Sequence, residues 1–266
     1  RFTSDLYALD FNFHGSFVSG LIASNGLGSA SVAPSARVCT RKVLSEDGIG
    51  TFGDVAAAIV YAADYGANVI NMSLGAYFDT REDGGSQLIA LLQSAVDFAV
   101  KTRGVVVVAS AGNSAINLDT DAPSLRSIPA QLDGVISVGA TGPDLSGNYD
   151  ALASYSNFGG KTGIDLVAPG GDLPDPNNHF DLILSVCSTF VCGATNFYVL
   201  GAGTSFSAPH VSATAAIVQA MLGGAPSPAA VTKCITEQAD HVGPKAIFGA
   251  GRLNVLNAAL CGTGGT

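Results

Sequence analysis

Short apolar stretches alternate with longer amphipathic ones over much of the chain. Residues 37–44, 67–74, 104–111 and 134–140 are short and rich in branched aliphatic side chains, so each predicts a β-strand. The third stretch is apolar almost without interruption, which is typical of a strand covered on both faces of its sheet. We therefore expect a sheet with a layer of structure on each side.

Two segments between the predicted strands carry apolar residues at helical spacing. Residues 52–65 place Val55, Ile59 and Ala63 on one face, and residues 86–102 repeat leucine in the same way. Strands that alternate with helices indicate right-handed crossovers and parallel pairing. The predicted fold class is α/β, with three helix–sheet–helix layers around a mostly parallel central sheet.

No linker divides the sequence, because glycine and serine are scattered and no proline-rich or charge-rich stretch separates the apolar segments. Residues 1–266 therefore predict one domain, with enough chain to bury a large core. The composition has 12 lysines and arginines against 21 aspartates and glutamates, a net charge of -9. This balance argues against a nucleic-acid partner, which needs a basic face. No apolar stretch is long enough to predict a membrane span.

The five cysteines predict two disulfides. Cys187 and Cys192 flank a short loop, as in a hairpin disulfide, and Cys234 and Cys261 fall in the last two predicted helical segments. Cys39 is left over inside an apolar stretch and is predicted to be a buried thiol. None of the five forms a metal-binding CxxC pair. Two disulfides indicate an oxidising compartment, so we expect a secreted protein.

Three polar residues stand at positions suited to chemistry. Asn113 follows an apolar strand, and ligands bind beyond the carboxyl ends of parallel strands. Ser205 opens an apolar helical run, where backbone N–H groups and the helix dipole favour developing negative charge. His14 precedes another apolar helix and is suited to take a proton near neutral pH. Singly, each also has an ordinary interpretation as a turn asparagine, a cap serine or a helix-terminal histidine.

Taken together, the surroundings of these residues resemble the subtilase family of serine proteases. The segment Gly203-Thr-Ser-Phe-Ser-Ala-Pro-His210 closely resembles the family's serine motif. The segment His14-Gly-Ser-Phe-Val-Ser-Gly20 resembles its histidine motif, and Ala111-Gly-Asn113 its oxyanion-hole motif. The resemblance runs nearly the whole length of the chain.

The resemblance implies an endopeptidase that hydrolyses proteins or peptides through an acyl-enzyme, with broad specificity. Ser205 would attack the carbonyl, His14 would take its proton, and Asn113 would stabilise the oxyanion. The chemistry needs no cofactor. The resemblance also implies a cleft that pairs with an extended peptide. The residues expected to bind substrate there are Ser73, Leu74, Gly75, Ser110, Ala111, Gly112 and Ser127.

One member of the family's catalytic triad has no counterpart in the sequence. The family's orienting aspartate lies on a strand well before the histidine, and Asp5 and Asp10 are too close to His14 to occupy that strand. Asp10 instead resembles an acidic residue at the cleft rim of some members. An imidazole without its carboxylate can adopt the wrong tautomer, at a cost of about 10⁴ in turnover.

Three explanations of the absent aspartate stay open. The segment that carries it was cut off and remains bound, or it lies outside residues 1–266, or the protein is an inactive relative. We expect the first or second, and hence a domain that lacks its N-terminal segment and has its own cleaved fragment as a partner. The alternative function is a peptide-binding pseudoprotease. A lipase-type hydrolase is disfavoured, because it expects Gly-x-Ser-x-Gly with its acid and histidine after the serine.

Calcium is the one metal that the sequence leaves open. The segment Asp119-Thr120-Asp121 and the loop from Asp172 to Asp175 offer oxygen ligands of the type that calcium prefers. A structural calcium site and plain solvated acidic loops are both compatible with these segments.

Overall fold

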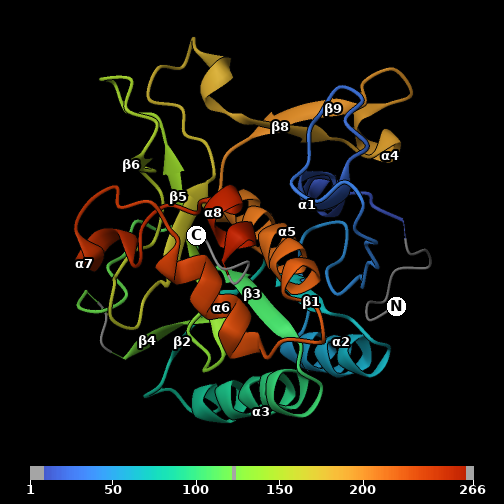
Figure 1. Ribbon diagram of the computed structural model, residues 1–266, viewed down its shortest axis with the longest axis vertical. Coiled ribbons are helices and arrows are strands. Elements are labelled where there is room, and N and C mark those ends of the chain that lie inside the picture. Colours follow the sequence, from blue (N-terminus) through green and yellow to red (C-terminus); the bar gives the residue numbers. More distant parts are fainter. Residues whose placement is uncertain (1–8, 122–123, 262–266) are drawn as a thin grey trace.

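The computed structural model describes residues 9–121 and 124–261, and a mostly parallel sheet runs through its centre (Figure 1). Helices cover both faces of the sheet, which confirms the predicted fold class. The four parallel strands, in spatial order, are β1 (Val69–Met72), β3 (Val106–Ser110), β5 (Val135–Gly142) and β7 (Leu166–Pro169). The short strand β6 (Ala151–Leu152) pairs antiparallel with the end of β5.

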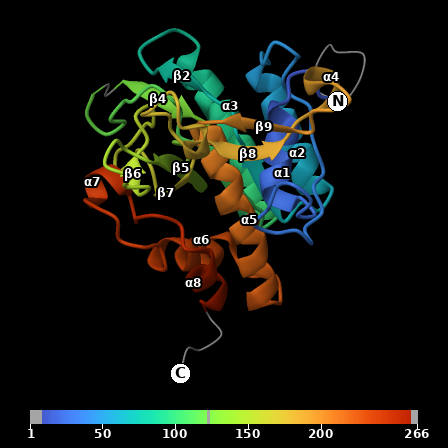
Figure 2. The same ribbon diagram turned by 90° about the horizontal axis from the view of Figure 1, so that it is seen from above.

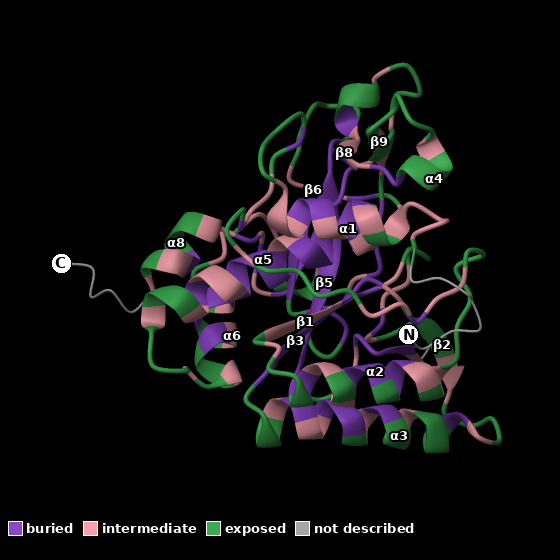
Figure 3. Ribbon diagram, turned by 90° about the vertical axis from the view of Figure 1, so that its right-hand side faces the viewer, coloured by how far each residue is buried: buried purple, intermediate pink, exposed green. Residues whose placement is uncertain are grey.

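Each face of the sheet has its own core. On one side lie α2 (Phe52–Asp64) and α3 (Gly85–Asp97), the latter continued by a π-helical turn at Phe98–Thr102. On the other side lie α5 (Thr204–Leu222), α6 (Pro228–Glu237) and α8 (Val255–Leu260). Figure 3 shows the buried strands β3 and β5 running between the two layers.

Strand β3 explains the unbroken apolar stretch in the sequence. All five of its residues are buried. Val107 and Ala109 belong to the core under α2 and α3, and Val106 and Val108 to the core under α5. Alternate side chains point to opposite faces of a strand, so a sheet covered on both sides needs an apolar residue at every position.

Two antiparallel pairs of strands and a helix complete the surroundings of the sheet. Strands β2 (Ala76–Asp79) and β4 (Leu125–Ile128) pair antiparallel, as do β8 (Ile183–Val186) and β9 (Tyr198–Gly201). The helix α1 (His14–Ala23) packs against α5 and β8, near the β8–β9 hairpin (Figures 1 and 2). The shorter elements are the 3-10 turn η2 (His179–Asp181), α4 (Thr189–Cys192) and α7 (Lys245–Phe248).

The predictions for residues 37–44 and for Cys39 are wrong. The segment forms no strand, and Cys39 is exposed. Strand β1 is the edge of the sheet within the described residues, and the segment lines a cavity together with Asn71 and Ser73 of the β1 end. A strand requires a hydrogen-bonding neighbour, so an apolar, strand-like sequence that lacks one stays irregular.

Both predicted disulfides are confirmed. The Cα atoms of Cys187 and Cys192 are 6.1 Å apart, and those of Cys234 and Cys261 are 5.5 Å apart. The second bridge ties α6 to the end of α8. Across residues 9–121 and 124–261, no helix combines the length and the apolar character needed to cross a membrane.

Candidate active site

Ser205 lies in the first turn of α5, and the end of β1 holds that turn in place. Pro209 has no N–H, so it cannot donate to the carbonyl of Ser205 four residues earlier. The hydroxyl of Ser73 donates to that carbonyl instead, at 2.6 Å. The hydroxyl of Ser205 in turn donates weakly to the carbonyl of Ser73, at 3.5 Å. Pro209 therefore leaves the carbonyl of Ser205 free to bind Ser73, which joins the serine turn to the end of β1.

His14 is the first residue of α1, and Asp10 binds the start of that helix. The Asp10 carboxylate accepts hydrogen bonds from the backbone N–H groups of Asn12, Phe13 and Ser16 and from the Ser16 hydroxyl, all between 2.6 and 2.9 Å. Burial opposes ionisation of Asp10, but these hydrogen bonds outweigh it and lower its pKa. Asp10 is therefore an ionised residue that caps the N-terminus of α1, where His14 lies.

The imidazole of His14 is half-buried beside the ring of Phe206, with the ring centroids 5.9 Å apart. Burial lowers the pKa of His14, and the negative charge of Asp10 offsets part of that effect. The imidazole is thus neutral near neutral pH, which is the state in which it accepts a proton.

Asn113 follows β3, and its side chain is oriented by the residue before the serine. Its Oδ1 accepts from the backbone N–H of Thr204 at 2.9 Å and from the Thr204 hydroxyl at 2.8 Å. With Oδ1 held in this way, Nδ2 lies on the side of Gly203, where an added Cβ would be 3.4 Å from it. The amide donor of Asn113 is therefore presented next to the serine turn.

Asn157 holds the loop that carries Asn113. Its buried side chain accepts from the backbone N–H groups of Ser114 and Ile116, at 3.2 and 3.1 Å. It donates to the carbonyl of Ala111 and to the hydroxyl of Tyr77, both at 2.7 Å. The sequence analysis missed Asn157, because an asparagine close to two glycines is typical of a turn and does not by itself indicate a functional residue.

The predicted residues meet in one cavity of about 1350 Å³. Ala111 is the exception: it is fully buried and does not line the cavity, although its carbonyl anchors Asn157 and Ser127. The predicted residues that do line the cavity are His14, Ser73, Leu74, Gly75, Ser110, Gly112, Asn113, Ser127 and Ser205.

The loops singled out for calcium use their carboxylates within the chain. Asp119 accepts hydrogen bonds from Lys161 and Thr162, and Asp172 accepts from Ser154. In the part of the chain that the structure describes, no three His, Cys, Asp or Glu side chains come together as a metal site. The calcium prediction remains untested. Asp5, weighed above as a triad candidate, lies outside the described residues.

A hydroxyl at a helix start, a neutral imidazole and a side-chain amide line one cavity, and these are the groups that a serine hydrolase site requires. On a three-layer α/β fold, in the chain order His14, Asn113, Ser205, they define a serine protease domain of the subtilisin type. The model of the subtilase family matches residues 4–251, and the chain belongs to that family.

Curated relatives agree with this assignment. A thermophilic serine proteinase from Bacillus sp. (strain AK1) is 35% identical over 259 residues, which cover 96% of this chain and 54% of the relative. An extracellular protease from Xanthomonas campestris pv. campestris is 35% identical, over 94% of this chain and 40% of that protein. Subtilisin DY from Bacillus licheniformis is 34% identical, over 97% of this chain and 81% of that protein. The chain thus spans about half the length or less of the first two.

Solved structures share the fold. A lanthipeptide protease has a TM-score of 0.79 and 29% identity, over 93% of this chain and 75% of that chain. The epidermin leader peptide processing serine protease from Staphylococcus aureus has a TM-score of 0.85 and 25% identity, over 98% of this chain and 65% of that chain. The sheet and its helical layers are therefore those of known proteases.

Proposed function

We propose that this chain is the catalytic domain of a secreted serine endopeptidase that cleaves extended peptides through an acyl-enzyme. One observation carries the proposal: Ser205, His14 and Asn113 come from α5, α1 and the loop after β3, and they line the same cavity. Residues so distant in sequence converge at the carboxyl end of a parallel sheet, where such folds place their chemistry.

The reaction assigns one role to each side chain. His14 takes the proton of the Ser205 hydroxyl as the oxygen attacks the peptide carbonyl, and it then protonates the leaving amine. The oxyanion accepts hydrogen bonds from the backbone N–H of Ser205 and from Nδ2 of Asn113. Water repeats the same sequence on the acyl-enzyme and releases the second product.

Labelling with a fluorophosphonate tests the nucleophile. We expect covalent labelling of the folded protein at Ser205, and none in Ser205→Ala. Ser207→Ala is the matched control, because Ser207 lies in the same helix but is fully buried. Its variant should label as the unmodified protein does. If the folded protein takes up no label, the enzyme proposal fails and a peptide-binding pseudoprotease is favoured instead.

The substrate proposed is an extended polypeptide of broad sequence. Ser73, Leu74 and Gly75 follow β1 and line the cavity, so their backbone can pair with a peptide as an added strand. Secretion is supported by the two disulfides and by the name of the Xanthomonas relative. Digestion of a peptide mixture tests the specificity: cleavage after many residue types is expected, and cleavage after a single type would contradict it.

A separate polypeptide segment is proposed to supply the carboxylate that orients His14. Within residues 9–121 and 124–261, no carboxylate is hydrogen-bonded to the imidazole, and both oxygens of Asp10 are occupied by α1. The outer edge of β1 is unpaired in the described residues, and Asn71 of β1 lines the same cavity as Val38 and Val43. An extended segment in this cavity could pair with β1 and add a strand to the sheet.

Intact mass under native and denaturing conditions tests this partner. We expect the active protein to carry a bound peptide with an aspartate, which is lost on denaturation together with activity. An active preparation in which no aspartate-bearing segment accompanies residues 1–266, in cis or in trans, would rule the partner out. The assignment of Ser205 would be unaffected by that result.

A further inference from the structure

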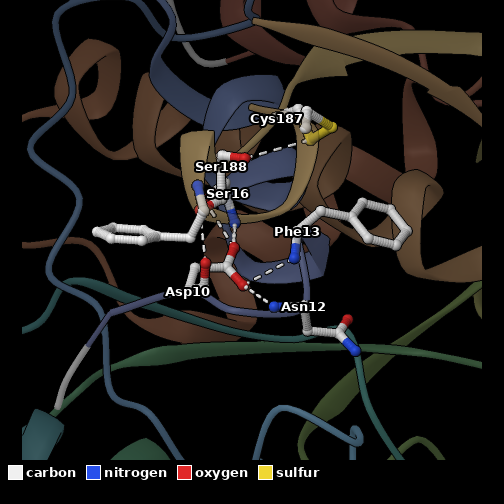
Figure 4. Close-up of a disulfide and its surroundings, with 8 residues drawn as sticks. Asp10, Asn12, Phe13, Ser16, Cys187 and Ser188 are labelled. Carbon is white, nitrogen blue, oxygen red and sulfur yellow. Dashed lines mark hydrogen bonds between the residues drawn. A yellow bond between two sulfur atoms is a disulfide. The ribbon is translucent and has the colours of Figure 1, made fainter. Parts of the chain in front are cut away.

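The tip of the β8–β9 hairpin lies beside the start of α1 (Figure 4). Here the Cys187–Cys192 disulfide closes over the single turn of α4. We call residues 187–193 the stapled turn. Ser188, at the N-terminus of α4, accepts a hydrogen bond from the backbone N–H of Phe190 and is enclosed by the disulfide. The position of the Ser188 hydroxyl is therefore set by the bridge.

Two contacts join the stapled turn to the segment before α1. The Ser188 hydroxyl donates a hydrogen bond to the backbone carbonyl of Asp10. The ring of Phe190 packs on that of Phe11, with the centroids 5.0 Å apart. The first contact holds the main chain of Asp10, and the second holds its neighbour.

Asp10 carries this constraint on to His14. The residue at the cap position of α1 is Phe13, which has no side chain able to cap a helix and has a left-handed φ of 79°. Such a backbone is costly for a bulky residue and persists only where its surroundings hold it. The Asp10 carboxylate does so by accepting from the N–H groups of Phe13 and Ser16, on either side of His14 (Figure 4).

The rest of the hairpin holds the same helix further along. The Ser185 hydroxyl donates to the carbonyl of Phe17 at 2.8 Å, and a Cβ on Gly20 would lie within 2.6 Å of side-chain atoms of Ser185 and Val186. The middle of α1 is therefore anchored to β8 without help from the stapled turn. What the turn adds is control of the first residues of the helix.

We propose that the Cys187–Cys192 stapled turn positions the general base, by fixing Asp10 through Ser188 and thereby the backbone that carries His14. This inference rests on the proposed function. The disulfide is then a positioning element of the active site, and its removal misplaces the imidazole while the fold remains.

The two disulfides provide a matched pair of variants for the test. Cys187→Ser/Cys192→Ser opens the stapled turn, and Cys234→Ser/Cys261→Ser opens a bridge between α6 and the end of α8. The second bridge spans 27 residues and the first spans 5, so the second variant should lose more thermal stability. The loss of kcat should instead be larger in Cys187→Ser/Cys192→Ser, because only that variant opens the stapled turn.

We expect opening of the stapled turn to lower kcat by 10- to 100-fold with little change in KM, on the order expected for a misplacement of about 1 Å. The Cys234→Ser/Cys261→Ser variant should keep kcat within about twofold at a temperature where both variants are folded. Ser188→Ala should reproduce part of the kcat loss, and Ser188→Thr, which keeps the hydroxyl, should restore it.

Three results would overturn the inference. One is a kcat within twofold of the unmodified protein once the stapled turn is opened, and the second is equal losses of kcat in the two double variants. The third is a loss in Ser188→Ala that Ser188→Thr does not restore. An unmodified protein that neither turns over nor labels would instead refute the proposed function, so the two failures are distinguishable.

Discussion

Replacement of Asn157 by alanine should couple a loss of stability to a loss of activity. The side chain is fully buried and makes four hydrogen bonds, three of them to the backbone of the loop that carries Asn113. Alanine removes all four and leaves a cavity. The loop that carries Asn113 would then lose the side chain that holds its conformation.

The magnitude follows from those four bonds. A net value of about 1 kcal/mol each gives an upper figure of about 4 kcal/mol. The carbonyl of Ala111 still accepts from the Ser127 hydroxyl, and the Tyr77 hydroxyl still donates to Ser114, so two of the groups retain a partner. We therefore expect a loss of about 3 kcal/mol, which corresponds to a fall in Tm of roughly 6–12 °C for a domain of this size.

Thermal unfolding followed by circular dichroism measures the first effect, and kcat measured well below the Tm of the variant measures the second. We expect kcat to fall on the order of 10-fold, because Asn113 is no longer held against Thr204. Asn196→Ala, at an exposed position, is the control and should change neither. A shift in Tm below about 2 °C together with an unchanged kcat would show that Asn157 does not hold the loop.

Three further predictions follow from the site and from the C-terminal ion pairs. Asn113→Ala should lower kcat by about 10²–10³-fold with little change in KM, a magnitude carried over from a subtilisin, and an unchanged kcat would remove Asn113 from the oxyanion site. The midpoint of the acid limb of kcat/KM reports the pKa of His14, which burial lowers and the negative charge of Asp10 raises. Asp10→Asn should move that midpoint lower still, because the charge that raises the pKa of His14 is gone; a midpoint that rises would contradict this. Arg252 forms ion pairs with Asp150 and Asp240, so Arg252→Met should cost on the order of 1 kcal/mol near neutral pH. Hydrogen bonds from Asn254 and Arg252 lower the pKa of Asp240, so that stability is present above the ordinary pKa of an aspartate and is lost as the pH falls through the lowered one. The Tm difference between Arg252→Met and the unmodified protein should therefore vanish in strong acid, and a constant difference would exclude the ion pair as its source.

The local sequence pattern was sufficient to predict an element wherever the periodicity of its apolar residues matches its buried faces. The apolar run of β3 predicts a strand covered on both faces, since each of its side chains meets one of two cores. The helical spacing of α2 and α3 reports their buried faces in the same way. The disulfides could be predicted because Cys187 and Cys192 flank a short loop, and Cys234 and Cys261 lie in the last two helical segments.

Local pattern failed where a neighbour decides the structure. Residues 37–44 have the composition of a strand, but a strand exists only with a hydrogen-bonding partner, and none lies beside them in the described chain. Cys39 is exposed for the same reason. Ala111 stands in the predicted substrate segment but points its side chain into the core, because the loop after β3 turns through Gly112.

The sequence by itself determined the layered α/β fold and the three residue types of the site, because these depend on side-chain chemistry and on spacing along the chain. Only the tertiary structure decided how the site is held. Thr204 orients Asn113, Asn157 shapes the loop around it, and the stapled turn reaches Asp10 from 178 residues away in sequence. Such contacts follow from how the chain packs, and hydrogen bonds between distant segments leave no periodic trace in the sequence.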